Sequence, residues 1–203
     1  LVIEDHRSDS VDVIHTIVDL NIRPVLNTSI SGNTKLLIKA KTAAVNDMRF
    51  DFEGLIVDSV LGTTVSGFDH QDSLLYVQLS QPLDQTQQSE ITVYYHGQPE
   101  QDDTGWGGFY FSGGYAWNLG VGFGADPHSY GRIWFPCFDN FIERSSFEFF
   151  ITTDSVKTAA CNGLLLNEIS NGDGTRTFHW KLDQSIPSYL ACVAVGTYET
   201  LNS

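Results

Sequence analysis

The chain has 203 residues, with 25 acidic against 11 basic side chains and a formal net charge of -14. A surface with this charge repels phosphate backbones and anionic headgroups, so we expect neither nucleic acid nor a membrane surface as a partner. No apolar run approaches the roughly 18 residues of a membrane-spanning helix, and the opening LVIEDHRSDS lacks the basic and apolar segments of a signal peptide.

Apolar and polar side chains alternate with period two, which is typical of half-buried strands. In VDVIHTIVDLNI (11–22), the even positions from Ile14 to Ile22 line one face, whereas His15, Asp19 and Asn21 lie on the other. Further strands are predicted at 34–44, 47–52, 55–61, 73–79, 90–96, 146–153, 177–182 and 189–199, with turns at SISGN (29–33), VSGFDHQD (65–72), GQPEQDD (97–103) and NGDGTR (171–176). The pattern predicts an all-β, antiparallel fold, built as a β-sandwich or as curved, saddle-like sheets in a single domain.

A segment rich in glycine and aromatic residues, GWGGFYFSGGYAWNLGVGFG, occupies positions 105–124. Aromatic faces beside glycine turns suit a platform for sugars or peptides. The same composition also suits a tight hairpin whose rings cover the end of a sheet. Both interpretations stay open at this point.

Motifs for catalysis or metal binding are missing from the sequence. No H-E-x-x-H, G-x-S-x-G or G-x-x-x-x-G-K-[ST] occurs, and the six histidines never lie four residues apart. The three cysteines, at 137, 161 and 192, lack C-x-x-C spacing, and we interpret them as buried free thiols. The chain is therefore expected to hold no metal and no cofactor.

The stretch YGRIWFPCFDNF (130–141) places single charged residues among five aromatic rings. Pro136 cannot donate a ladder hydrogen bond, so a strand through Ile133 and Trp134 should end or bend there. Asp139 is expected to close an Asx turn onto the following amides, with Arg132 or Arg144 as its counter-charge. The stretch is therefore predicted to be a rigid structural corner.

This corner resembles the amino-terminal β domain of zinc aminopeptidases of the aminopeptidase N type, within the gluzincin metallopeptidases. Their domain carries R-x-x-F-P-C-x-D-E-P-x-x-K-A-x-F. The residues that match it are Arg132, Phe135, Pro136, Cys137, Asp139 and Phe147, while Arg144 replaces the lysine and Asn140, Phe141 and Ser145 depart from it. VDVIHTIVDLNI, AACNG (159–163) and IPSYLACVAVG (186–196) are similar to further segments of that domain in the same order. The resemblance covers about residues 9–200.

The resemblance implies that residues 1–203 are the amino-terminal domain of a larger enzyme, whose zinc ligands would lie in a catalytic domain beyond Ser203. It implies that this domain packs on the catalytic domain, helps to wall the peptide cleft and gives one side chain to the substrate's free α-amine. With one extra loop residue, DPHSYGR (126–132) aligns with the family's E/Q-P-x-x-x-R, which assigns that role to Asp126.

Two alternatives remain on the sequence alone. One is a stand-alone β-sandwich that binds carbohydrate or protein through Trp106, Tyr110, Tyr115 and Trp117. The other is a homologue of the metallopeptidases that has lost the zinc site.

Overall fold

The computed structural model describes residues 6–71, 73–124 and 126–198, in which 14 strands form three sheets. Helical structure in this part is confined to single 3₁₀ turns at Arg7–Asp9, Gly131–Ile133 and Ser188–Leu190. None of these turns has the length or apolar character needed to cross a membrane. The prediction of an all-β fold is confirmed.

The strands are β1 (Val11–Ile22), β2 (Ile30–Ala40), β3 (Val45–Asp51), β4 (Ile56–Leu61), β5 (Val65–Gln71), β6 (Leu74–Leu83), β7 (Gln88–Gly97), β8 (Gly108–Ser112), β9 (Tyr115–Leu119), β10 (Ser145–Asp154), β11 (Thr158–Cys161), β12 (Leu164–Ser170), β13 (Thr175–Ile186) and β14 (Val193–Gly196). One long sheet has the order β12-β13-β10-β1-β2-β7-β4. Two short sheets, β11-β14-β9-β8 and β3-β6-β5, complete the fold.

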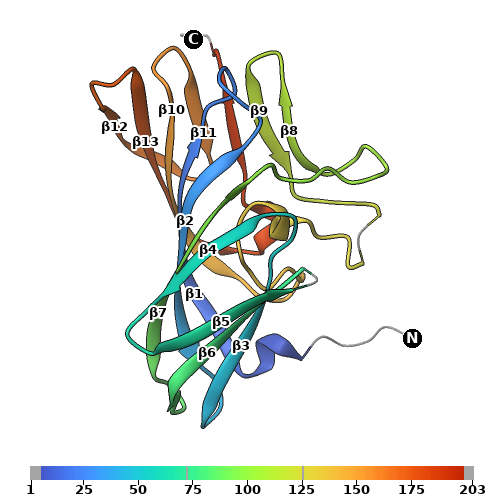
Figure 1. The fold of residues 1–203 in the computed structure, drawn as a ribbon, viewed down its shortest axis with the longest axis vertical. Coiled ribbons are helices and arrows are strands. Elements are labelled where there is room, and N and C mark those ends of the chain that lie inside the picture. The colour runs from blue at the N-terminus through green and yellow to red at the C-terminus, as the bar shows by residue number, and fades with distance from the viewer. Residues whose placement is uncertain (1–5, 72, 125, 199–203) are drawn as a thin grey trace.

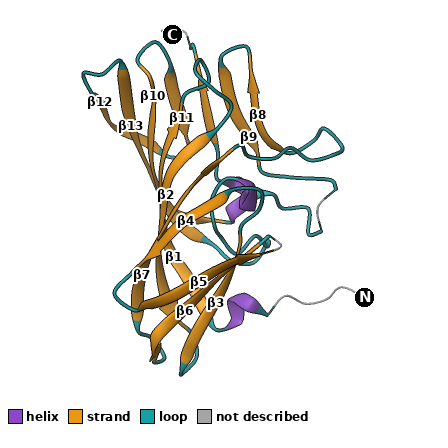
Figure 2. Ribbon diagram, viewed as in Figure 1, coloured by secondary structure: helices purple, strands orange, loops and turns teal. Residues whose placement is uncertain are grey.

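The long sheet twists through the whole height of the molecule, and the short sheets lie at its two ends (Figure 1). In this view β3, β5 and β6 lie at the bottom, while β8 and β9 lie at the top, beside the last strand, β14. Figure 2 shows loops and short 3₁₀ turns filling the space between the two short sheets. The corner residues 130–141, which are gold in Figure 1, belong to this middle layer.

Most strand pairs are antiparallel, but β1 and β10 at the centre of the long sheet pair in parallel, with His15 opposite Ser146 and Asn21 opposite Thr152. Parallel neighbours need a long crossover connection. Here the crossover contains both β2–β9 and the corner, which brings the corner back across the face of the long sheet.

A stack of aromatic rings fills the core between the corner and the long sheet. Phe147 and Phe149 on β10 stack at 5.5 Å, and Trp134 of the corner stacks on Phe149 at 6.3 Å between ring centroids. The Tyr95 hydroxyl donates to the Trp134 carbonyl at 2.8 Å. All four rings are buried, so the corner is part of the hydrophobic core.

Several local predictions are wrong. SISGN (29–33) mostly belongs to β2, and the part of VSGFDHQD (65–72) that the structure describes forms β5 instead of a turn. Of the described residues in the strand predicted at 189–199, only Val193–Gly196 form a strand. Ile133 and Trp134 lie in and after a 3₁₀ turn instead of a strand. The strands β11 and β12 were not predicted, because β12 is exposed along its whole length and shows no alternation.

Candidate functional site

The carboxylate of Asp139 lies at the centre of the corner, fully buried. Its Oδ1 accepts hydrogen bonds from the Gly131 amide at 3.1 Å and the Ser188 hydroxyl at 2.7 Å. Its Oδ2 accepts from the Arg132 amide at 3.3 Å and from Arg132 Nη1 at 3.0 Å. Burial raises the pKa of Asp139, while the Ser188 hydrogen bond and the charge of Arg132 act in the opposite direction. Asp139 thus joins the 3₁₀ turns at 131–133 and 188–190.

The expected Asx turn onto following amides is made by Asn140 instead of Asp139. Asn140 Oδ1 accepts from the amides of Ile142 at 2.9 Å and Glu143 at 2.7 Å. Asp139 accepts from the preceding amides at 131 and 132 because the chain folds back on itself at the 3₁₀ turn. Pro136 lies in this fold-back, between the 3₁₀ turn and Asp139.

Arg132 is the counter-charge of Asp139, and it also connects the corner to the surface. Its Nε donates to Glu53 Oε2 at 2.8 Å, and its Nη1 donates to the Ser129 carbonyl at 3.0 Å. Arg144, the other arginine considered for this role, is exposed and forms no ion pair within the described part of the chain. One guanidinium therefore holds both the buried carboxylate and an outer one.

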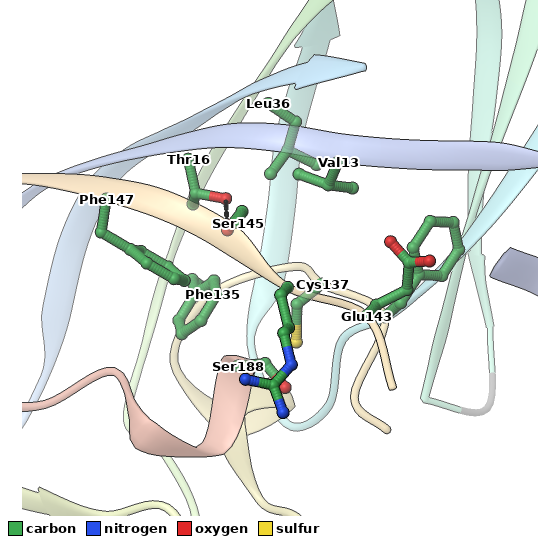
Figure 3. Close-up of a pocket in the computed structure, with 11 residues that line it drawn as sticks. Val13, Thr16, Leu36, Phe135, Cys137, Glu143, Ser145, Phe147 and Ser188 are labelled. Atoms are coloured by element: carbon green, nitrogen blue, oxygen red, sulfur yellow. Dashed lines mark hydrogen bonds between the residues drawn. The ribbon is translucent and has the colours of Figure 1, made fainter. Parts of the chain in front are cut away.

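Beneath the corner is a cavity of about 20 Å³, which Figure 3 shows in close-up. Phe135, Cys137 and Ser188 line it together with Phe147. The hydroxyls of Thr16 and Ser145 at its wall hydrogen bond to each other at 2.9 Å. A cavity of this size holds about one water molecule, so it offers no room for a peptide or a sugar.

A larger hollow of about 450 Å³ opens beside Arg132. Its lining residues are Glu53, Ser73, Glu100, Gln101, Asp102, Asp103, Gly124, Asp126, Tyr130 and Arg132. Five of these are carboxylates and one is a guanidinium, which Asp139 and Glu53 already neutralise. The hollow therefore carries a surplus of negative charge and favours a cationic group.

Asp102 holds the loops around this acidic hollow in place. Its carboxylate accepts from the amides of Phe123 at 2.9 Å and Gly124 at 3.1 Å and from the hydroxyl of Thr104. The Thr104 hydrogen bond and the two amides lower the pKa of Asp102. Asp126, two residues beyond Gly124, lines the same hollow and forms no ion pair with any other described residue.

The glycine-rich segment forms a hairpin, in which Gly113 and Gly114 connect β8 to β9 with positive φ angles. Tyr110 and Trp117 stack on each other at 5.5 Å across this hairpin. Trp106 is 65% exposed and packs edge-on against Phe123. The Tyr110 hydroxyl donates to the carbonyls of Gly105 at 3.0 Å and Gly107 at 2.7 Å, which connects the loop that carries Trp106 to this hairpin.

The three cysteines are all free, as expected, but only Cys137 is buried. Cys161 is partly buried and Cys192 is exposed. Glu53, Asp102 and Ser188 were missed as members of the corner and the acidic hollow. Only Ser188 had a signal in the sequence, since it lies in IPSYLACVAVG, one of the segments that are similar to the family's domain.

The fold and its corner place the chain among all-β domains built from one long sheet and two short ones. Its family follows from the sequence. Residues 14–190 match the peptidase M1 N-terminal domain, so the chain belongs to that family.

Solved structures share the fold at low sequence identity. An M1 zinc metallopeptidase from Deinococcus radiodurans superposes with a TM-score of 0.80 at 22% identity, over 92% of this chain and 42% of that chain. Native leukotriene A4 hydrolase from Saccharomyces cerevisiae superposes with a TM-score of 0.68 at 18% identity, over 95% of this chain and 30% of that chain. The leucine aminopeptidase 2 of Vanderwaltozyma polyspora is 36% identical over 67 residues, which is 33% of this chain and 10% of that protein. The chain matches less than half the length of each.

Proposed function

We propose that the chain is the non-catalytic amino-terminal domain of a larger zinc-dependent aminopeptidase. In this proposal it packs on the catalytic domain, helps to wall the peptide cleft and binds the amino terminus of the substrate. The observation that carries the proposal is the match of residues 14–190 to the peptidase M1 N-terminal domain. The shorter length of the chain relative to similar metallopeptidases supports a catalytic domain elsewhere in the parent protein.

Zinc would belong to that catalytic domain. Within the described ranges of this chain, no group of three His, Cys, Asp or Glu side chains is arranged to hold a metal ion. These residues therefore do not fit a zinc site, and we assign this domain no part in zinc binding.

Asp126 is proposed to bind the free α-amine of a peptide substrate. A free amino terminus is mostly protonated at neutral pH, and the acidic hollow offers it uncompensated carboxylates. A charge-assisted hydrogen bond to Asp126 contributes about 1.5–3 kcal/mol. Such a bond favours unblocked peptides over peptides with an acetylated amino terminus.

The test is Asp126→Ala in the full-length parent enzyme. We expect kcat/KM for unblocked dipeptide substrates to fall by about 10- to 150-fold, at 1.4 kcal/mol per tenfold, while the zinc content is unchanged. Asp103→Ala removes a second carboxylate from the same hollow and is the matched control, with a smaller expected effect. Wild-type kinetics in Asp126→Ala would show that the amine is bound by another residue.

A further inference from the structure

Asp102 lies in the loop between β7 and β8, but its carboxylate binds the loop that follows β9. It accepts hydrogen bonds from the amides of Phe123 at 2.9 Å and Gly124 at 3.1 Å. The Thr104 hydroxyl donates to the same carboxylate, and Asp102 is only 7% exposed. Both carboxylate oxygens therefore accept from donors of the chain, and the two loops are fixed relative to each other.

The two loops also pack closely against each other. The Asp102 amide donates to the Gly107 carbonyl at 3.1 Å, which closes a turn in the first loop. A Cβ added to Gly107 would lie 2.0 Å from the Val121 carbonyl oxygen, so this turn lies directly against the second loop. The rings of Trp106 and Phe123 meet edge-on, with 6.3 Å between their centroids. The contact made by Asp102 is thus part of a close-packed unit.

Asp126 lies in the second loop, between two points at which that loop is held. An antiparallel bridge between Val121 and Ser129 joins the two ends of the loop. The hydrogen bond from the Gly124 amide to Asp102 holds the loop two residues before Asp126. Asp126 forms no ion pair with any other described residue, so the position of its carboxylate depends on these two attachments.

The strength of a bond to an α-amine depends on how well its acceptor is placed. A charge-assisted hydrogen bond between an ammonium and a carboxylate needs about 2.7–2.9 Å between the heavy atoms. A loop that becomes ordered only on binding loses conformational entropy at that step, whereas a loop that is already held does not. The attachment of the loop is therefore expected to set how strongly Asp126 binds the amine.

We propose that Asp102 is a positioning residue: it holds the loop after β9 so that the Asp126 carboxylate meets the α-amine of the peptide. Because its own oxygens are occupied by donors of the chain, Asp102 acts on the amine through Asp126. This inference rests on the proposed function, since it needs Asp126 to bind the amine. It adds a residue of a different loop on which recognition of free amino termini depends.

The test compares two ligands of the full-length parent that differ only in the α-amine. Leucine hydroxamate carries the amine, and 4-methylpentanohydroxamate is the same molecule without it. The ratio of their dissociation constants, measured by calorimetry, reports how strongly the amine is recognised. Asp126→Ala should lower this ratio by about 10- to 150-fold. Asp102→Ala should lower it by at least about fivefold, because the carboxylate of Asp126 is then misplaced.

Gly124→Ala separates position from charge, because it keeps every carboxylate of the acidic hollow. A Cβ at this position would lie 2.5 Å from Asp102 Oδ1, so the contact between the two loops cannot form unchanged. The ratio should fall in Gly124→Ala as it does in Asp102→Ala. Asp103→Ala is the matched control, since it removes one charge from the hollow but none of these hydrogen bonds. Its expected effect on the ratio is less than about twofold.

A double variant shows whether Asp102 acts through Asp126. In the Asp126→Ala background, Asp102→Ala should change the ratio by less than about twofold, because the group that it positions is already absent. A further fall as large as in the wild-type background would overturn the inference. The affinity for 4-methylpentanohydroxamate should be the same in all variants. An equal loss of affinity for both ligands in Asp102→Ala and Gly124→Ala would show a general structural role and would also overturn it.

The outcomes also separate this inference from the proposed function. A ratio that falls in Asp126→Ala but keeps its wild-type value in Asp102→Ala and Gly124→Ala would overturn the inference alone. A wild-type ratio in Asp126→Ala would overturn the proposed role of Asp126, and the inference with it.

Discussion

The buried carboxylate of Asp139 is the residue on which the corner depends. It accepts four hydrogen bonds, two from backbone amides and two from side chains of Ser188 and Arg132. These donors come from two chain segments more than fifty residues apart in sequence. Removing one partner of a buried ion pair is costly, because the other charge remains buried without compensation.

We therefore expect Asp139→Ala to lower the free energy of unfolding by about 3–5 kcal/mol. For a domain of this size that corresponds to a fall in Tm of about 6–20 °C. Asp139→Asn is the matched control, since it keeps an oxygen acceptor for Gly131 and Ser188 and removes the charge that faces Arg132. The expected order of Tm is wild type, then Asn, then Ala. Equal melting curves for all three would show that the aromatic rings alone hold the corner.

At this scale the sequence predicted the importance of Asp139 but not its geometry. The residue pattern and the family resemblance both pointed to Asp139, but they left Arg132 and Arg144 open as its counter-charge, and the structure shows Arg132. The Asx turn was assigned to the wrong side chain, because Asp139 and Asn140 are adjacent and have the same short reach. Glu53 was missed because nothing local in the sequence indicates that Arg132 reaches it.

The turns of the β11–β12–β13 region differ in how tightly the chain packs around them. Gly163 connects β11 to β12 with φ +92°, and an added Cβ would lie 2.0 Å from the carbonyl oxygen of Lys181. Gly172 connects β12 to β13 with φ +78°, and an added Cβ would meet nothing within 4 Å. The two glycines share a left-handed backbone but only one has a steric constraint.

Alanine substitutions at these glycines should separate the two effects. Gly172→Ala is expected to cost about 1–2 kcal/mol from the left-handed backbone alone. Gly163→Ala should cost about 1–3 kcal/mol more, because its methyl group forces β12 away from β13. Urea denaturation of both variants measures the difference. Equal costs would mean that the chain around Gly163 relaxes freely.

Strands were predicted from the sequence where one face of the strand is buried and the other is not. They were missed where the two faces are exposed to a similar degree. β1, β7 and β10 alternate between buried and less buried positions, so periodicity located them. β12 is exposed at every position, and β5 is never buried. Their place in the sheets comes from backbone pairing with β13 and β6, which the side-chain pattern does not encode.

At the scale of the whole molecule, the class of fold followed from the sequence but the order of strands did not. The parallel pairing of β1 with β10 joins residues more than 120 positions apart. Such pairing is decided by which strands can share one core, here through the rings of the corner. The acidic hollow likewise depends on loops that meet only after the sheets have formed.

Because the proposed function assigns zinc binding and catalysis to the catalytic domain, it leads to a prediction for the 203-residue chain alone. It should bind no stoichiometric zinc and hydrolyse no aminoacyl anilide, because a zinc site needs three or four preorganised ligands. Among the described residues, one arrangement that could be taken for a metal site lies on the outer face of the long sheet. There Glu148 lies 2.9 Å from His179 Nε2 and 3.7 Å from His15 Nε2.

This histidine pair is not expected to retain a metal ion. Lys181 Nζ lies 3.9 Å from the Glu148 carboxylate and repels a cation, and the other ring nitrogen of His15 is held by Ser146 at 2.8 Å. Metal analysis after dialysis should therefore find well below one zinc per chain, and His179→Ala should not change that value. One zinc per chain that is lost in His179→Ala would show that the outer face of the long sheet binds metal, and the assignment of zinc to the catalytic domain alone would then be wrong.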